Sequence, residues 1–405
     1  SSEKVYICVS DFNWESIMRP FFILLSVVAL LSCVERRTTD PYINGATRVI
    51  NIPEDYEQNI CSDALFESVD LVPLETTEEC LIGRVDRLLI CDSLYLINDT
   101  RQRVLVFDRT GKFRYQIGKR GGAPNEYLEV RDFLINDKSE LEILDFKKIL
   151  RYSLTGEFIG DTRFDYLSDE NLYCNPSFFV ASPIAGYYLW GSGMGSCKAG
   201  DGNCLMYKTD EEMKIERGYF PIGRGADGNH YRFSKYDKRI LIDPIFGDYN
   251  IYQIDSLDNL SARYVFDFGN KACKRDLDCS DMMSATVQKG LDESVVALYN
   301  FQETNKWLHL DFVYKGNVYS LFYSKTNDEV SVVDIKGCQL ENKNSFGFWG
   351  AIGVEGEALV NAVEASWVKA EVGRLNPVVV EKLGLNKWNS IQESDNPVLA
   401  FYRFK

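Results

Sequence analysis

Histidine, the side chain most often used to transfer protons near neutral pH, occurs only twice in this chain, at positions 230 and 309. A zinc site with three histidine ligands is therefore excluded, and a Ser-His-Asp triad would have to use His230 or His309. His309 alternates with apolar neighbours in a strand-like run, which indicates a structural role. His230 follows a glycine-rich segment and directly precedes Tyr231 and Arg232, so we predict that these three residues contact a ligand.

Other polar and aromatic side chains could also contact a ligand, although none of them forms a catalytic constellation. Arg131 and Asp132 precede an apolar run, and Trp190 and Trp349 each stand next to a glycine. An indole ring could stack on a sugar ring or a peptide, and buried packing is the alternative for both tryptophans. The chain has no Gly-x-Ser-x-Gly motif, and we predict no catalytic residue.

The spacing of the cysteines does not indicate a metal site. No Cys-x-x-Cys pair occurs among the 11 cysteines, so ribbon-type zinc sites and thioredoxin-like chemistry are unsupported. In an oxidising compartment some cysteines could pair. Cys197 with Cys204 is the first candidate and Cys273 with Cys279 the second, and free cysteines in the core are the alternative.

Charge and composition limit the partners. The formal net charge is −15 and no block of Lys or Arg stands out, so the chain repels phosphate backbones and we predict no nucleic-acid partner. No cofactor is evident. Calcium would suit a ring of acidic inner strands, although no Asp-x-Asp-x-Asp-Gly loop argues for it. Asp99 and Asp145 recur at one position of a repeat, which favours a role in capping turns.

The N-terminal part has the pattern of a lipoprotein signal. Met18 and Arg19 precede an apolar run over residues 21–31, which ends in Ser32 and Cys33. We predict a signal peptide over residues 18–32, lipidation of Cys33 and a tether over residues 33–45, with a short buried helix as the alternative for the apolar run. Residues 1–17 lack signal character and are interpreted as an over-called start or as added residues.

A repeated phrase supplies the strongest evidence on the fold. Residues 107–113 (FDRTGKF) return as residues 152–158 (YSLTGEF), 45 positions later, and apolar β-type runs precede each copy. A repeat of about 40–50 residues made of short strands is typical of a propeller blade. The sequence therefore predicts an all-β fold over residues 46–405, a six-bladed propeller of four-stranded antiparallel blades.

The expected strands of the first two blades are well marked, and those of the later blades are less so. The first blade should span residues 85–117 and the second residues 127–164. The sixth should combine residues 346–349 and 357–363 with the chain ends, so that the final strand over residues 397–404 closes the ring. Residues 284–299 and 377–391 carry apolar side chains at helical spacing and are predicted as helices inserted between strands.

The linker over residues 118–127, rich in glycine and ending in Glu-Tyr, resembles the blade junction of NHL-type repeats. Together with the lipobox, the phrase over residues 72–76 and the ending over residues 395–399, the chain resembles a family of six-bladed propeller lipoproteins common in gut Bacteroidota. This resemblance implies a propeller in the bacterial cell envelope, as an outer-membrane lipoprotein on the periplasmic or the surface side, and no settled activity.

Two functional hypotheses follow from these residues. The first is a non-enzymatic binding or scaffold propeller, held at the membrane by its lipid, that recognises a glycan, a peptide or an envelope protein. The second is an exported lyase or hydrolase that uses a metal in the central channel or a set of Arg, Tyr and carboxylate side chains. The first is favoured because the fold signal is complete and no catalytic motif accompanies it.

Overall fold

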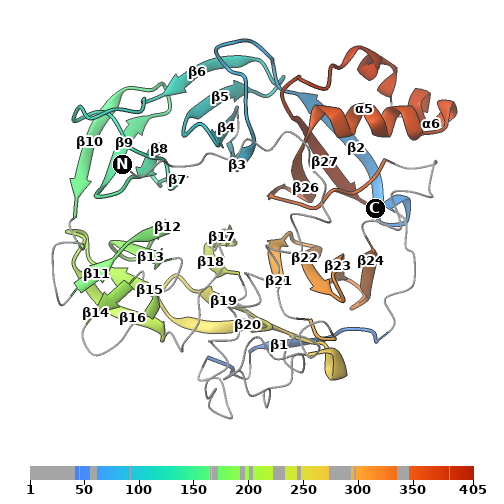
Figure 1. Cartoon of the computed structure of the whole chain (residues 1–405). Helices are drawn as coiled ribbons and strands as arrows, with labels where there is room; N and C mark the ends of the chain where they lie inside the picture. Colours follow the sequence, from blue (N-terminus) through green and yellow to red (C-terminus); the bar gives the residue numbers. More distant parts are fainter. Residues whose placement is uncertain are drawn as a thin grey trace, which may run out of the picture.

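The computed structural model describes residues 42–44, 46–54, 62–91, 93–164, 166, 172–191, 197–199, 204–221, 233–243, 248–272, 293–295, 298–334, 346–382 and 384–405. Over these residues the chain forms six four-stranded antiparallel blades arranged in a ring (Figure 1). The predicted propeller is confirmed.

In each of the first three blades the chain runs from the innermost strand outward. Blade 1 contains β3 (Val85–Cys91), β4 (Leu94–Asp99), β5 (Val104–Asp108) and β6 (Phe113–Ile117). Blade 2 contains β7 (Asp132–Ile135), β8 (Glu140–Leu144), β9 (Lys148–Ser153) and β10 (Phe158–Arg163). Blade 3 contains β12 (Pro176–Ala181), β13 (Tyr187–Gly191), β15 (Cys204–Thr209) and β16 (Ile215–Pro221), accompanied by the separate pair β11 (Leu172–Cys174) and β14 (Cys197–Ala199).

Blades 4 and 5 follow the same order, and blade 6 combines strands from both ends of the chain. Blade 4 contains β17 (Phe233–Tyr236), β18 (Arg239–Ile242), β19 (Asn250–Ile254) and β20 (Leu260–Asp267). Blade 5 contains β21 (Leu298–Glu303), β22 (Trp307–Tyr314), β23 (Asn317–Ser324) and β24 (Val330–Asp334). Blade 6 contains β25 (Gly353–Glu355), β26 (Ala358–Val363), β27 (Val398–Phe404) and β2 (Phe66–Pro73).

The two ends of the chain meet in blade 6. β2, from the N-terminal part, pairs antiparallel with the last strand β27, with Val69 opposite Tyr402. This pairing confirms the predicted closure. The preceding strand β1 (Arg48–Asn51) pairs in parallel with β20, placing Ile50 opposite Phe266. The N-terminal part therefore contributes strands to blade 4 as well as to blade 6.

The core lies between neighbouring blades, because both faces of a blade are covered. In β4, Tyr95 and Ile97 pack toward blade 6, whereas Leu96 packs toward blade 2. Successive side chains of a strand point to opposite faces, so a strand buried on both faces is apolar at every position. This explains why the inner runs of the sequence do not alternate between polar and apolar residues.

The repeated phrase is the turn between the third and fourth strands of a blade. In blade 1, the Asp108 carboxylate accepts hydrogen bonds from the backbone N–H groups of Thr110 (2.8 Å) and Lys112 (3.1 Å). Ser153, Asp210 and Asp255 cap the corresponding turns of blades 2, 3 and 4 in the same way. Three residues after each cap the backbone is left-handed; these four positions are Gly111, Gly156, Met213 and Asp258.

The predicted helices are found in part. Residues 377–391 contain α6 (Pro377–Lys382) and the 3-10 helix η2 (Leu385–Ser390), as expected, and α5 (Ala365–Arg374), which was not predicted, precedes them in the same insertion between β26 and β27. All three lie beside blade 6 at the outer edge of the ring (Figure 1). Shorter helical segments are α2 (Ser62–Leu65) and η1 (Gly269–Lys271).

Two local predictions were wrong. Residues 298 and 299, the end of a predicted helix, begin strand β21, and residues 284–292 of that helix lie outside the described residues. Residues 346–349 are irregular rather than a strand, and β25 supplies the inner edge of blade 6 instead. Among the described residues, no helix is both long enough and apolar enough to cross a membrane.

Candidate functional site

A cavity of about 750 Å³ opens between blades 3 and 4. Its walls come mainly from blade 3, from strands β13, β15 and β16 and the turns that follow β12 and β15, and blade 4 adds Asp258 from the turn between β19 and β20. The lining residues are Ile184, Ala185, Tyr188, Lys208, Asp210, Glu211, Glu212, Lys214, Glu216, Arg217, Tyr219 and Asp258. The cavity is thus built largely from charged side chains on hairpin turns, which the rigid strands hold in place.

Lys208 supplies a buried cation to this cavity. The residue is 7% exposed, and its ammonium group donates to the backbone carbonyls of Ala185 and Thr209, the latter at 2.9 Å. The Glu216 and Asp258 carboxylates lie 3.6 and 3.8 Å from the same nitrogen. Carbonyl and carboxylate oxygens therefore fix the position of the ammonium group.

Asp258 joins the two blades across the cavity. It occupies the left-handed position of the turn between β19 and β20, and its carboxylate accepts hydrogen bonds from the Ser182 hydroxyl at 3.0 and 2.9 Å. Aspartate tolerates this backbone conformation better than most residues. Burial, together with the Asp258 charge, raises the pKa of Tyr188, so its phenol stays protonated and can act as a hydrogen-bond donor.

The rim of the cavity combines carboxylates with exposed aliphatic side chains. Glu211, Glu212 and Glu216 are exposed around the opening. Ile184, which lines the cavity, is 65% exposed, and Leu257, the neighbour of the lining residue Asp258 in the chain, is 71% exposed. These two side chains offer apolar surface that a ligand could cover.

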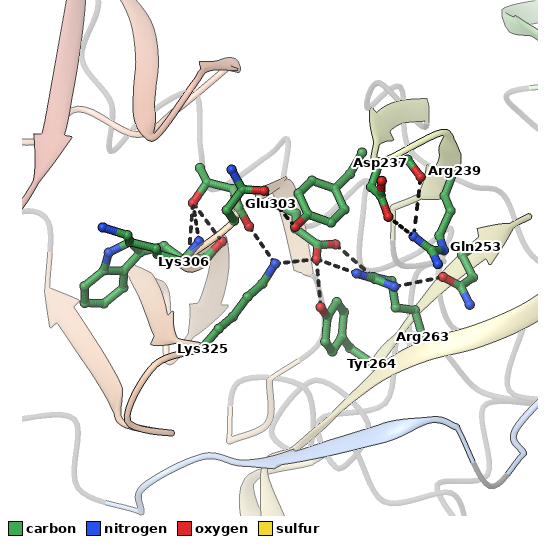
Figure 2. Close-up of polar contacts among 12 residues, drawn as sticks. Asp237, Arg239, Gln253, Arg263, Tyr264, Glu303, Lys306 and Lys325 are labelled. Atoms are coloured by element: carbon green, nitrogen blue, oxygen red, sulfur yellow. Dashed lines mark hydrogen bonds and ion pairs between the residues drawn. The ribbon is translucent and has the colours of Figure 1, made fainter.

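A second polar cluster links blades 4 and 5, and Figure 2 shows Glu303 between Arg263 and Lys325. The buried Glu303 carboxylate accepts two hydrogen bonds from Arg263, at 2.9 and 2.7 Å. It also accepts hydrogen bonds from the Tyr264 hydroxyl at 2.8 Å and from the Lys325 ammonium group at 2.5 Å. The Tyr236 ring lies under Lys325, 4.4 Å from its nitrogen.

This cluster contains the Arg, Tyr and carboxylate side chains that the enzyme hypothesis required, but they bind one another. Burial and the Glu303 charge raise the pKa of Tyr264, so its phenol is a poor base. Burial lowers the pKa of Lys325, whose ammonium group is held by Glu303 and by the Thr304 carbonyl at 2.6 Å. The arrangement stabilises the contact between the two blades.

Comparison with known proteins places the chain in a family. The sequence profile of the domain of unknown function DUF4934 matches residues 47–403. The chain belongs to the DUF4934 family. No curated protein matches this DUF4934 chain.

Solved structures resemble the chain to different degrees, and the first of the following three is similar enough to show a shared fold. A candidate exported protein of Bacteroides fragilis (BF0058) superposes with a TM-score of 0.70 at 19% identity, covering 88% of the DUF4934 chain and 99% of its own. A Bacteroides caccae protein of unknown function gives a TM-score of 0.39 at 9% identity, covering 63% and 83% of the two chains. The WD40 domain of Neurospora crassa Pan2 gives 0.38 at 11% identity, covering 84% and 96%.

Arg131 and Asp132, predicted to contact a ligand, lie where blades 1, 2 and 3 meet. The fully buried Asp132 carboxylate lies 3.0 Å from the Arg87 guanidinium of blade 1 and accepts a hydrogen bond of 3.1 Å from the Phe179 backbone N–H of blade 3. Arg131 lies over the Phe146 ring, at 4.7 Å, and donates to the Pro176 carbonyl at 3.0 Å. Both side chains thus connect blades in the DUF4934 fold.

The two tryptophans differ in their surroundings. Trp190 is fully buried beside Phe220 and Phe233, which corresponds to the packing alternative. Trp349 is partly exposed, and its ring lies 4.5 Å from that of Trp367 in α5. Only Trp349 therefore keeps surface that a ligand could reach.

The remaining predicted residues are placed only in part. His309 is buried against aromatic rings, with Nε2 3.2 Å from the Asp311 carboxylate, as expected for a structural histidine. Other predictions fall on residues or side chains that the structure does not describe and stay predictions: His230, Tyr231, Arg232, Cys33, Cys197, Cys273 and Cys279. Both predicted disulfides, including that of Cys204, are therefore untested. Among the described residues, no group of three or more His, Cys, Asp or Glu side chains could hold a metal ion.

Lys208, Asp258 and Glu303 were not predicted as site residues. A signal for Asp258 existed, because Asp255 and Asp258 have the same spacing as Asp108 and Gly111 in the repeated turn. An aspartate at the usual glycine position indicates a side chain with a role outside its own turn. No comparable pattern marks Glu303, whose partners come from other strands.

Proposed function

We propose that this DUF4934 protein is an exported binding module that holds its ligand in the cavity between blades 3 and 4. The observation that carries the proposal is the cavity itself, which two blades build around the Lys208 and Asp258 pair. Binding sites are usually preformed hollows in which a few polar groups point toward the ligand. The blade framework supplies such a hollow without any need for a moving part.

Export and a lipid anchor belong to the same proposal. The lipobox that ends at Cys33 supports anchoring, and the similarity to a candidate exported Bacteroides protein supports an envelope location. The NHL-like linker over residues 118–127 supports a relationship to propeller lipoproteins. A scaffold at the membrane that presents a binding cavity is consistent with all three observations.

We propose binding rather than turnover because the charges at the centre of the cavity, Lys208 and Asp258, already have partners. Lys208 is held by carbonyl and carboxylate oxygens, and Asp258 by Ser182 and Lys208. A catalytic base or nucleophile needs a group that is free to exchange a proton with its substrate. In the cluster around Glu303, the Arg, Tyr and carboxylate groups likewise bind one another.

A thermal-shift screen tests the proposal, since a ligand that binds only the native state raises Tm. The library holds glycans, peptides and divalent metals, the last with and without chelator. Every compound is run on the protein, on Asp258→Gly and on Gly156→Asp. Gly156 is the matched control because it occupies the same turn position in blade 2 and no atom lies within 4 Å of an added Cβ. A shift that Asp258→Gly loses and Gly156→Asp keeps supports the cavity, and a shift that both variants keep contradicts it.

A further inference from the structure

We infer that the ligand of the cavity between blades 3 and 4 is a polypeptide segment with basic and aliphatic side chains. This inference rests on the proposed function and narrows it to one class of partner. Three features of the cavity carry it: its aliphatic rim, its charge and the burial of its aromatic rings.

The aliphatic rim offers one anchor point in the lining of the cavity, Ile184, and a second beside it on the neighbouring blade, Leu257. Ile184 is in the turn between β12 and β13, and Leu257 is in the turn between β19 and β20. The hydrogen bonds from Ser182 to Asp258 hold these two turns together, so the exposed side chains are carried on adjoining turns. Aliphatic side chains of a bound segment would remove both from water, which is the main source of affinity at protein interfaces.

The charges of the cavity favour a cationic partner. Five carboxylates and three cations line it, and two of these cations already have carboxylate neighbours. Lys208 lies near Asp258, and Lys214 pairs with Glu212 at 2.5 Å. Glu211 is exposed, and the Glu216 carboxylate, although 3.6 Å from the Lys208 nitrogen, has a side chain that is still 54% exposed, so both can meet Lys or Arg of a ligand.

The aromatic rings of the cavity disfavour a glycan. Sugar rings stack on open aromatic faces, but Tyr188 is 1% exposed and Tyr219 is 8% exposed. The Arg217 guanidinium also covers Tyr219, at 4.9 Å from the ring centre. Aliphatic rather than aromatic surface is therefore what the cavity presents, and this suits a peptide better than a sugar.

Fluorescence anisotropy with the full protein tests this assignment. The probe is a fluorescein-labelled peptide of alternating lysine and leucine, and the comparison peptides replace lysine by glutamate or leucine by serine. Maltohexaose and the other glycans of the screen are tested as competitors. We expect the lysine–leucine peptide to bind more tightly than either comparison peptide, with an affinity that falls as salt increases.

Paired variants locate the binding. The double variant Glu211→Lys/Glu216→Lys and the double variant Ile184→Asp/Leu257→Asp should each weaken binding by roughly tenfold or more. Glu381→Lys and Val378→Asp are the controls, because each makes the same type of substitution once, at an exposed position of α6. Both controls should bind like the unchanged protein.

The possible outcomes distinguish a wrong peptide assignment from a wrong binding site. A glycan whose binding is lost in Asp258→Gly would overturn the peptide assignment and leave the cavity as the binding site. Peptide binding that the cavity variants do not weaken would overturn the assignment as well. If no compound of either class depends on the cavity, both the peptide assignment and the proposed binding site are wrong.

Discussion

The Arg263 guanidinium of blade 4 binds the Glu303 carboxylate of blade 5 through two hydrogen bonds, and the Glu303 side chain is completely buried. Because Lys325 shares this carboxylate, Glu303→Gln would leave two largely buried cations without a counter-charge. We expect the variant to lower the free energy of unfolding by about 3 kcal/mol, as is typical when one partner of a buried ion pair is removed. Urea unfolding measures the change.

The control for this prediction is Glu157→Gln, which removes an exposed carboxylate from a turn of blade 2. Its effect should stay within about 0.5 kcal/mol. An equally small loss for Glu303→Gln would show that the cluster does not stabilise the contact between blades 4 and 5.

Gly111 and Gly156 occupy the same turn position in blades 1 and 2, with φ angles of 82° and 92°. A Cβ on Gly111 would lie 1.9 Å from the Pro73 carbonyl oxygen, whereas a Cβ on Gly156 would meet no atom within 4 Å. Gly156→Ala should therefore lose only about 1–2 kcal/mol of unfolding free energy, the cost of a left-handed residue. Gly111→Ala should lose clearly more, because blades 1 and 6 must also separate.

Chemical denaturation of the two alanine variants side by side checks this difference. Equal losses would mean that the close contact between the blade 1 turn and strand β2 is not important for stability.

Asp132 makes stability depend on pH. Burial raises the pKa of its carboxyl to about 6, although the Arg87 guanidinium and two backbone N–H groups act in the opposite direction. The folded state therefore binds a proton more tightly than the unfolded state, so this contribution is fully present below about pH 4 and is lost as pH rises through about 6. Stability measured relative to Asp132→Asn should fall as pH increases across this window.

The measurement is urea unfolding of the protein and of Asp132→Asn at several pH values between about 4 and 7. A difference that stays constant with pH, or that increases, would show that the ion pair with Arg87 outweighs the burial of the carboxylate.

Strand β1 and the residues before it should stabilise blade 4 without being needed for ring closure. Tyr42 packs on Phe220 and Tyr252, with ring centres 5.5 and 5.7 Å apart, and β1 covers the outer edge of β20. A chain that begins after Ile52 should stay folded with a Tm lower by a few degrees, because β2 still pairs with β27. A chain that begins after β2 should not fold. Differential scanning calorimetry compares the two, and an unchanged Tm for the first would contradict the role of β1.

The strands were predicted best in the blades whose amino-acid sequences resemble each other. Blades 1 and 2 were found because both turns carry glycine at the left-handed position, at Gly111 and Gly156. In blades 3 and 4 the same backbone is formed by Met213 and Asp258, so the repeat disappears from the sequence while the turn remains. The capping residue at each turn was the more constant feature.

The candidate site was harder to predict than the fold. Asp258 contacts Ser182, 76 positions earlier in the chain, and Lys208, 50 positions earlier. No local sequence pattern encodes contacts between residues so far apart. Ligand contact by Arg131 and Asp132 stays a prediction, whereas the structure gives both side chains partners that join neighbouring blades. The pattern of apolar residues along the sequence predicts the strand or turn in which a residue lies. The contacts of its side chain depend on how the blades pack, which this pattern does not encode.

Amide hydrogen–deuterium exchange tests the central claim most directly. The protein is compared with and without a saturating amount of the first ligand that raises its Tm. The account predicts slower exchange in the turns over residues 182–186, 210–214 and 255–259, which border the cavity between blades 3 and 4. Unchanged exchange in these turns, with protection appearing instead in the linker over residues 118–127 or in α5, would show that the ligand binds elsewhere on the propeller.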